Sequence, residues 1–577
     1  NNLSASVKKQ IEDCNLTGIE FVESNSRYYP LGDFCSYVVG YAKSYNDQSV
    51  KKMVGEMGLE LSYDKQLKGK NGYKVYQTDA NGYALVDGTL REKDPTNGND
   101  LYLTIDSGLQ RNLDYLMSNA YSESGAEVVT AGVMEIKTGK ILAMSTYPSF
   151  NPNERNISTF NNYFLEGTIE CGSVFKPFIY ADSIEEGKYD HSAYYNSGSY
   201  NVYYGNKLVA TIKDHNGGQG WGTITYDQGL YHSSNVAICN LLDQGYVTKD
   251  VLTEKLNDLG FFQGDTMDGL TCSSSINAYT RKNAGRLEYL TTGFGQGSTV
   301  TPYQLLKAYS VFGNDGKTVQ PHIVDKVVNP ETNKVVYQAT PKYSKQIFST
   351  NTISQVKDLM LGVIEDEQGT GKTYRLDNDV RMIGKTGTGQ VVENGGYSTT
   401  LYMHSFVGIA PYDDPQVVMF LTFKSGYSYA QYMPNIVKQT MNEALQVVNR
   451  YNAKNTTAVD QSYTLDSYTN QSVNYVKSKL ESKSLSVQII GNGSSVIEQY
   501  PLAKSKVTSG DKVFIKTEGK DITLPNLIGW SKKEVQTYAS LAGIQLTIDG
   551  TSGHVTAQSV GENTVVHSGD NLTVAIS

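Results

Sequence analysis

Ser173 and Lys176 stand three residues apart at the start of an apolar segment, Val174–Ala181, whose pattern predicts a helix. Pro177 is tolerated only near the beginning of a helix, where its missing N–H costs little, so we expect Ser173 at the helix N-terminus. Free backbone N–H groups there can help to hold an oxyanion, and Lys176 lies on the same helix face as the hydroxyl. A lysine made neutral by burial or by a second cation could take the serine proton. The pair predicts a nucleophilic serine with a lysine as its general base.

A second polar group, Ser233-Ser-Asn235, follows 60 residues later and leads into the helical pattern Val236–Asp243. The Ser233 hydroxyl can relay a proton between Lys176 and an amine that leaves or enters the site. The Asn235 amide can both hold Lys176 and bind a substrate amide. Because Ser and Asn are also favoured helix N-caps, capping is the ordinary alternative.

The third group, Lys385-Thr386-Gly387-Thr388, lies in a segment that predicts a strand. Lys385 supplies the second cation, and with Thr386 and Thr388 it can hold a substrate carboxylate. Gly387 has no side chain, so a peptide could lie close against the strand. The backbone N–H groups of Ser173 and Thr388 would form an oxyanion hole, where one donor changes a rate by about 10²–10³. The ordinary alternative is an exposed edge strand.

Composition limits the kinds of protein that this chain can be. At 577 residues, with 39% hydrophobic and 19% charged residues, it is long enough for several globular domains. Its net charge of −9 argues against a polyanion, so we expect no nucleic acid partner. The seven histidines show no zinc-ligand spacing and the five cysteines contain no CxxC pair, so we expect no metal, no cofactor and at most two disulfides. No run of about 18 apolar residues is present.

The C-terminal part of the chain contains an internal repeat. An offset of 59 residues pairs Leu465 with Leu524 without a gap, and it ends by matching Ser509-Gly-Asp511 to Ser568-Gly-Asp570. Each copy predicts an extended start, a short helix and alternating strands. The expected helices are Ser472–Leu480 and Ser531–Leu541, and the expected strands are Leu485–Ile489, Ile544–Ile548, Lys512–Lys516 and Asn571–Ala575.

Four regions follow from this pattern: residues 1–100, 101–455, 456–518 and 519–577. The second predicts a large α/β domain, with a helix at Ser107–Ala120 and strands at Glu127–Glu135 and Ile141–Ser145. A second Lys-Thr-Gly at 137–139 falls between these strands, and we interpret it as a hairpin turn. The first region shows strand and turn signals, among them Arg27–Gly32 and Gly58–Asp64.

The order SxxK, SxN and KTG resembles the signature of penicillin-binding proteins and serine β-lactamases. Flanking segments resemble the class B penicillin-binding proteins: Lys137–Met144, Pro148–Asn153, Gly293–Gly297 with Thr301-Pro302, Lys385–Gln390, which is close to the usual KTGTAQ, and the N-terminal Arg27–Gly32. The repeats resemble PASTA domains, which occur on surface kinases and transpeptidases of Gram-positive bacteria. The chain departs from the family at Cys171, where proline is usual.

The resemblance implies a multidomain α+β fold. It consists of a mainly β pedestal of the dimerisation type, a transpeptidase domain with an antiparallel sheet flanked by helices, and two βαββ PASTA repeats. It also implies that Ser173 attacks the penultimate carbonyl of a stem peptide ending in D-Ala-D-Ala, with Lys176 as base and Ser233 as proton relay. An amine of a neighbouring stem peptide then resolves the acyl-enzyme and forms a cross-link in peptidoglycan. β-Lactams would acylate the same serine covalently, and no cofactor is needed.

The same resemblance implies where and with what the protein acts. We expect a single N-terminal membrane anchor outside this sequence and a location on the extracytoplasmic face of the cell membrane. The expected partners are division proteins and a membrane glycosyltransferase of the SEDS family, in the synthesis of septal or spore wall.

Other functions with related motifs stay open at this point. A β-lactamase needs an activated water, often through an ExxLN glutamate, but Glu254-Lys-Leu-Asn257 is one residue short. A D,D-carboxypeptidase shares all three motifs and differs in using water as acceptor. The PASTA pair could instead make the chain a surface binding module or β-lactam sensor. We do not expect a bifunctional class A enzyme, because about 100 residues before the catalytic region cannot hold a glycosyltransferase.

Some residues near the motifs invite chemical roles that we do not assign. Cys171 could suggest redox control, but a reactive thiol needs a lowered pKa, and we expect a small buried residue. Asp214 and His215 are expected to line the groove wall or a loop, and we assign no metal to them or to His232. Trp221 is either a wall of the cleft or part of the core.

Overall fold

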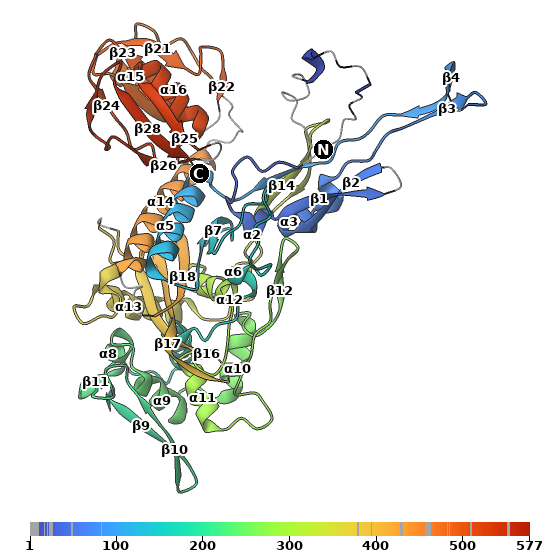
Figure 1. Cartoon of the computed structure of the whole chain (residues 1–577). Helices are drawn as coiled ribbons and strands as arrows, with labels where there is room; N and C mark the ends of the chain where they lie inside the picture. Colours follow the sequence, from blue (N-terminus) through green and yellow to red (C-terminus); the bar gives the residue numbers. More distant parts are fainter. Residues whose placement is uncertain are drawn as a thin grey trace. The chain divides into compact units, whose positions relative to one another are not determined.

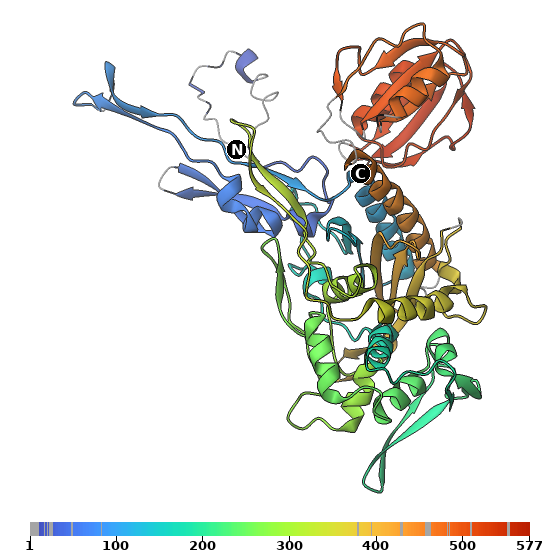
Figure 2. The same ribbon diagram turned by 180° about the vertical axis from the view of Figure 1, so that it is seen from behind.

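The computed structural model describes residues 11–14, 16, 18–19, 21, 27–47, 50–81, 83–377, 380–393, 395–426, 431–455, 463–481, 483, 485–507, 511–550 and 554–576. The chain divides into two compact units, residues 1–29 with 33–445 and residues 30–32 with 446–577, and each is described by itself. Figure 1 gives the elements along the chain, and Figure 2 shows them from behind. Both units mix helices and strands, as predicted.

The N-terminal part of the first unit consists mainly of two antiparallel hairpins, which confirms the expected β character. β1 (Tyr41–Asp47) pairs with β2 (Val50–Met57), and β3 (Tyr73–Thr78) pairs with β4 (Ala84–Lys93). Short helices accompany them: α2 (Ser36–Val39), α3 (Gly58–Ser62) and α4 (Asp64–Leu67).

Gly58–Asp64 is helical, although we expected strand and turn there. Gly58 has a φ of 62°, and a Cβ at this position would lie 2.6 Å from the Val38 carbonyl oxygen, so the chain turns sharply into α3. Leu59 is buried but Leu61 is 54% exposed, so the alternating leucines do not share one buried face. Tertiary contacts, including the Arg27–Glu60 ion pair at 2.7 Å, override this short alternation.

The centre of the first unit is a five-stranded antiparallel sheet, as predicted for the transpeptidase region. The strand order is β16-β17-β18-β6-β7, and the bounds are β6 (Val128–Glu135), β7 (Ile141–Tyr147), β16 (Ile383–Glu393), β17 (Gly396–Ala410) and β18 (Val417–Ser425). Residues 137–139 form the turn between β6 and β7, so this second Lys-Thr-Gly is a hairpin turn.

Helices flank this sheet and hold the segment that follows Ser173. α5 (Ser107–Ser124) contacts β6 and β7, α12 (Pro302–Tyr309) contacts β6 and β18, and α13 (Thr350–Glu365) contacts β16. α7 (Lys176–Glu185) is buried through Ile184. The Phe178 ring lies 5.0–5.8 Å from the rings of Phe175, Phe261, Tyr309 and Phe312. This aromatic cluster fixes the helix behind the site.

The remaining elements of the first unit connect these layers. They are α6 (Tyr163–Glu166), α8 (Tyr226–Tyr231), α9 (Asn235–Asp243), α10 (Lys249–Asp258), α11 (Arg286–Gly293), the short helices η2 (Ser310–Gly313) and η3 (Lys372–Tyr374), and the paired strands β5 (Asp100–Leu103), β8 (Tyr194–Asn196), β9 (Ser199–Tyr204), β10 (Lys207–Lys213), β11 (Thr223–Thr225), β12 (Asp265–Met267), β13 (Leu270–Cys272), β14 (Val324–Asn329) and β15 (Lys334–Gln338). α14 (Met433–Asn455) leads into the second unit. Among the described residues, no helix combines the length and apolar character needed to cross a bilayer.

The second unit contains the two repeats. Each has a helix and a three-stranded sheet with one parallel pair: α15 (Val473–Glu481) with β20 (Ser486–Ile490), β21 (Val496–Tyr500) and β23 (Lys512–Thr517), and α16 (Lys532–Ala542) with β25 (Gln545–Asp549), β26 (Val555–Gln558) and β28 (Asn571–Ile576). Equivalent strands begin 59 residues apart, so the predicted offset is confirmed. Each repeat adds a short pair that we did not predict, β19 (Tyr463–Thr464) with β22 (Lys506–Val507) and β24 (Ile522–Thr523) with β27 (Val565–Val566).

The two repeats pack against each other through a shared core. Ile490 and Phe514 of the first repeat join the buried cluster of the second. The Lys512 ammonium lies 3.8 Å from the centre of the Trp530 ring and 3.3 Å from the Glu534 carboxylate. The two repeats therefore share one packed core within the second unit.

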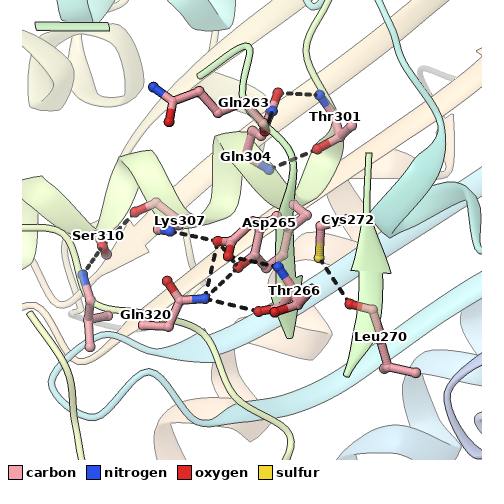
Figure 3. A network of polar contacts seen from close by, with 12 residues as sticks. Gln263, Asp265, Thr266, Leu270, Cys272, Thr301, Gln304, Lys307, Ser310 and Gln320 are labelled. Atoms are coloured by element: carbon pink, nitrogen blue, oxygen red, sulfur yellow. Dashed lines mark hydrogen bonds and ion pairs between the residues drawn. The ribbon is translucent and has the colours of Figure 1, made fainter. Parts of the chain in front are cut away.

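A polar network around Asp265 joins β12 to α12 and to the segment before β14 (Figure 3). The Asp265 carboxylate accepts from Lys307 Nζ at 2.7 Å, from the Tyr303 hydroxyl at 2.8 Å and from Gln320 Nε2 at 3.2 Å. Burial raises the pKa of Asp265, but the hydrogen bond and charge of Lys307 outweigh this effect and lower the pKa below its ordinary value. The ionised carboxylate therefore stabilises this side of the domain.

Asp265→Ala removes the acceptor of these three donors and should lower the free energy of unfolding of the first unit by about 2–3 kcal/mol. Differential scanning calorimetry would detect this as a lower melting temperature of that transition. Asp250→Ala, which removes an exposed carboxylate from α10, is the matched control. Equal melting temperatures for the two variants would contradict a stabilising role of the network.

Candidate active site

Ser173 lies in a short 3₁₀ helix, η1 (Gly172–Phe175), that runs directly into α7. Pro177 occupies the first turn of α7. Val174 and Phe175 are buried, whereas Ser173 is partly exposed. The predicted position of Ser173 at the start of a helical segment is confirmed.

Gly172 brings three distant segments together beside Ser173. Its φ is 61°, and a Cβ there would lie 2.3 Å from the Thr388 carbonyl oxygen on β16. Its N–H donates to the Gly295 carbonyl oxygen at 3.0 Å. A Cβ on Gly295 would in turn lie 2.2 Å from the Gly172 carbonyl oxygen. Glycine at both positions lets the serine segment lie against the Lys-Thr-Gly strand.

Two lysines converge on the Ser233 hydroxyl. Lys385 Nζ donates to Ser233 Oγ at 2.8 Å and to the Thr386 carbonyl oxygen at 3.0 Å. Lys176 Nζ donates to the Ser233 carbonyl oxygen at 2.5 Å and to Ser233 Oγ at 3.4 Å. Ser233 has a φ of 58°, which is uncommon for a serine. In this conformation the carbonyl oxygen and the hydroxyl of Ser233 both face Lys176. The structure thus brings together three of the predicted site residues.

Both amines lose basicity in this environment. The side chains of Lys176 and Lys385 are fully buried. Burial lowers the pKa of Lys176 to about 7, although the Asp214 carboxylate opposes this shift. Burial, and then the charge of Lys176, hold the pKa of Lys385 well below its ordinary value. Since two protonated amines around one hydroxyl repel each other, a neutral amine is available near neutral pH.

Gly387 allows a contact within the chain that we did not predict. A Cβ at Gly387 would lie 2.7 Å from the Cys171 carbonyl oxygen, so the glycine lets the chain's own serine segment approach the strand. Thr386 Oγ1 donates to Thr370 Oγ1 at 3.0 Å, and Thr388 is exposed. Thr370 was not predicted, because nothing in its local sequence marks the contact.

The Asn235 amide does not hold Lys176, contrary to our expectation. Its Nδ2 donates to the Lys213 carbonyl oxygen at 2.9 Å. Asn235 begins α9, which Ser234 caps, so capping is part of this motif's role.

Asp214 holds the Ser233–Asn235 segment from behind and was missed as a site residue. It is 2% exposed. Its Oδ1 accepts from Ser234 Oγ at 2.8 Å, from Asn235 N at 2.7 Å and from Val236 N at 3.1 Å, and its Oδ2 accepts from Gly198 N at 2.8 Å. We had expected only a groove wall or loop here. An acidic residue suits a helix N-terminus, but its long sequence separation concealed this contact.

Trp221, which we left open between cleft wall and core, is partly buried and packs against the core next to His232. The Trp221 ring stacks on His232 at 4.5 Å with an interplanar angle of 9°. His215 Nε2 lies 2.9 Å from the His232 carbonyl oxygen. Burial lowers the pKa of both histidines, so they are neutral near pH 7. The described residues contain no group of three or more His, Cys, Asp or Glu side chains that could hold a metal ion.

The described cysteines are free thiols, and Cys171 is buried. Burial raises its pKa well above the ordinary value, which opposes thiolate formation. The expectation of a small buried residue is confirmed.

Asp214→Ala would leave four donors without their acceptor and should destabilise the first unit by about 3 kcal/mol. Thermal unfolding should show the loss, while Glu186→Ala, which removes an exposed carboxylate at the end of α7, should change little. An unchanged melting temperature for Asp214→Ala would contradict the role of this carboxylate as a clamp.

Family profiles match almost the whole chain. Residues 129–446 match the profile described as "Penicillin binding protein transpeptidase domain", and residues 1–103 match "Penicillin-binding Protein dimerisation domain". Residues 463–519 and 522–577 each match the PASTA domain.

Relatives and solved structures agree with these profiles. Stage V sporulation protein D of Bacillus subtilis is 30% identical over 533 residues, covering 89% of this chain and 79% of the relative. A probable peptidoglycan D,D-transpeptidase PenA of Neisseria meningitidis is 26% identical, covering 74% and 69%. The crystal structure of Penicillin Binding Protein 2X from Streptococcus thermophilus has a TM-score of 0.69 at 24% identity, covering 99% of this chain and 86% of that one, and shows the fold.

The matches run in one order along the sequence, and the transpeptidase profile includes the Ser173 helix, the Ser233 turn and the Lys385 strand. The chain therefore belongs to the class B penicillin-binding proteins, with a dimerisation domain before its transpeptidase domain and two PASTA domains after it.

Proposed function

We propose that this protein is a peptidoglycan D,D-transpeptidase that cross-links stem peptides through an acyl-enzyme on Ser173. The observation that carries the proposal is that two buried lysines donate to the Ser233 hydroxyl. Lys176 lies in the helix that follows Ser173, and Lys385 lies on the strand that contacts the Ser173 segment. Relatives that bear the name peptidoglycan D,D-transpeptidase support the same reaction.

In the first half-reaction, neutral Lys176 accepts the Ser173 hydroxyl proton while the serine oxygen attacks the penultimate carbonyl carbon of the donor peptide. The resulting oxyanion is held by the backbone N–H groups of Ser173 and Thr388. When the intermediate collapses, the C–N bond breaks and the terminal D-Ala leaves as an amine, protonated from Lys176 through Ser233. The product is an ester between Ser173 and the donor peptide.

In the second half-reaction, the amine of a neighbouring stem peptide attacks this ester and gives up a proton through Ser233 to Lys176. The ester bond breaks, Ser173 regains its proton, and a new amide joins the two peptides. Before the terminal D-Ala leaves, Thr386 and Thr388 bind its carboxylate. Lys385 is buried and donates to Ser233 Oγ, so it positions this hydroxyl and is not a direct ligand of the carboxylate.

The wider setting is also a proposal. We place the domain limits at 1–100, 101–455, 456–518 and 519–577, and the enzyme on the extracytoplasmic face of the cell membrane, held by an N-terminal anchor. Its partners are division proteins and a membrane glycosyltransferase of the SEDS family, in septal or spore wall synthesis. The similarity to Stage V sporulation protein D supports the spore wall.

Fluorescent penicillin tests the nucleophile, because β-lactams acylate the same serine. Mass spectrometry should find one adduct, on the peptide that contains Ser173, and none in Ser173→Ala. Ser354→Ala is the matched control, since Ser354 opens another, exposed Ser-x-x-Lys match. An adduct that persists in Ser173→Ala would contradict the proposal.

The pH dependence of penicillin acylation tests the base. Burial lowers the pKa of Lys176 to about 7, so the amine is protonated and inactive below this pH and neutral above it. The acylation rate should therefore rise through pH 7 and level off. Asp214→Asn removes a charge that raises this pKa, so the midpoint of the pH profile of this variant should move to lower pH. Lys176→Arg stays protonated and should lose about 10²–10⁴ in rate.

A flat pH profile from about pH 5 to about pH 9, which brackets the expected midpoint near 7, would contradict Lys176 as base. A second experiment identifies the acceptor that resolves the acyl-enzyme. An acceptor amine identifies a transpeptidase, whereas water identifies a carboxypeptidase or a β-lactamase. We expect the amine product.

A further inference from the structure

The hairpin β9–β10 projects beyond α9 and away from the central sheet of the first unit in Figures 1 and 2. Its two strands are antiparallel: Ser199 pairs with Lys213 at one end, and Tyr204 pairs with Lys207 next to the turn. An isolated two-stranded hairpin is marginally stable in water, so its base must be fixed to the domain.

One face of the hairpin packs on the domain. Val202 is 1% exposed and Ile212 is 8% exposed, and both strands contact α9. The Tyr200 hydroxyl donates to Asp243 at the end of α9, and Arg286 pairs with the same carboxylate. These contacts fix the lower part of the hairpin to the domain.

The hairpin base is also part of the site's support. The Lys213 carbonyl oxygen accepts from Asn235 Nδ2 at 2.9 Å. The next residue, Asp214, holds the Ser233 segment, and its Oδ2 accepts from Gly198 N, one residue before β9. One end of the hairpin therefore contacts the Ser-x-Asn motif directly through Lys213, and the other end connects to it through Asp214.

Large apolar side chains near the tip of the hairpin lie in solvent. Tyr203 and Leu208 form a cross-strand pair on the face opposite Val202, whereas Tyr204 lies on the Val202 face beyond the packed region and Val209 lies at the register irregularity. Exposed fractions are 45% for Tyr203, 79% for Tyr204, 48% for Leu208 and 47% for Val209. We call these four residues the hairpin patch. Asn201 and Thr211, a cross-strand pair, continue the face of Tyr203 and Leu208 with polar groups.

The charge of the hairpin fits an anionic polymer of sugars and peptides. Residues 199–213 contain Lys207 and Lys213 and no carboxylate side chain, in a chain whose net charge is −9. Stem peptides of peptidoglycan end in carboxylates, and sugar rings present C–H faces that pack on aromatic rings. Tyrosine offers such a surface at a low cost in conformational entropy.

We propose that the hairpin patch binds the glycan-peptide strand whose stem peptide enters the site. This inference rests on the proposed function and adds to it a docking surface for the polymer, outside the three motifs. Binding there raises the local concentration of stem peptide at the site, so long strands are better substrates than short peptides.

The test compares Tyr203→Ala/Tyr204→Ala with Tyr115→Ala, which removes a tyrosine that is 43% exposed on α5. The probes are fluorescently labelled, uncross-linked glycan strands carrying pentapeptides, followed by anisotropy, and fluorescent penicillin, followed as Ser173 acylation. Both use the full chain, so the PASTA repeats contribute equally in every variant. The double variant should raise the dissociation constant for strands about tenfold and leave penicillin acylation within about twofold.

Lys207→Glu should also weaken strand binding, by a factor that shrinks as salt is added. Unchanged strand binding in both hairpin variants would overturn the inference and leave the proposed function intact. An equal loss of strand binding and penicillin acylation would also overturn it, because the hairpin would then only support the catalytic centre. A wild-type protein that penicillin never acylates would instead overturn the proposed function.

Discussion

The site depends on the burial of two lysine amines around one serine hydroxyl. A buried ammonium is unfavourable, so burial lowers the pKa of Lys176 to about 7, and burial together with the charge of Lys176 holds the pKa of Lys385 well below its ordinary value. The hydrophobic packing of α7, and the packing of η1 and α13 against β16, impose this burial. Without that packing the lysines would be ordinary surface cations, and neither could act as a base at neutral pH.

Several glycines permit this arrangement because they remove the atoms that would keep the segments apart. Gly172, Gly295 and Gly387 each stand where a Cβ would meet backbone at less than 3 Å. Gly389, where the family's usual motif has alanine, fits the same pattern, since its Cβ would lie 1.7 Å from the Glu170 carbonyl oxygen. This departure from the motif thus has a local reason in this chain.

The sequence predicted the features that depend on local pattern and motif order. The helix after Ser173, the strand of Lys385, the hairpin at 137–139 and the offset of 59 residues between repeats are all present. Our predictions were wrong or incomplete where contacts between distant segments determine the local structure or the partner of a side chain. Gly58–Asp64 is helical because of its tertiary contacts, Asn235 donates to Lys213, and Asp214 clamps a segment about 20 residues away along the chain. No local periodicity marks such contacts, and the roles of the site residues themselves stay proposals.

Carbon-13 NMR of protein labelled at lysine Cε, titrated from acid to alkaline pH, measures the protonation of these amines most directly. Lys176→Arg and Lys385→Arg assign the two signals. We expect both amines to lose their proton far below the ordinary lysine value of about 10.4, with Lys176 changing near pH 7. Two signals that titrate with the surface lysines would contradict it.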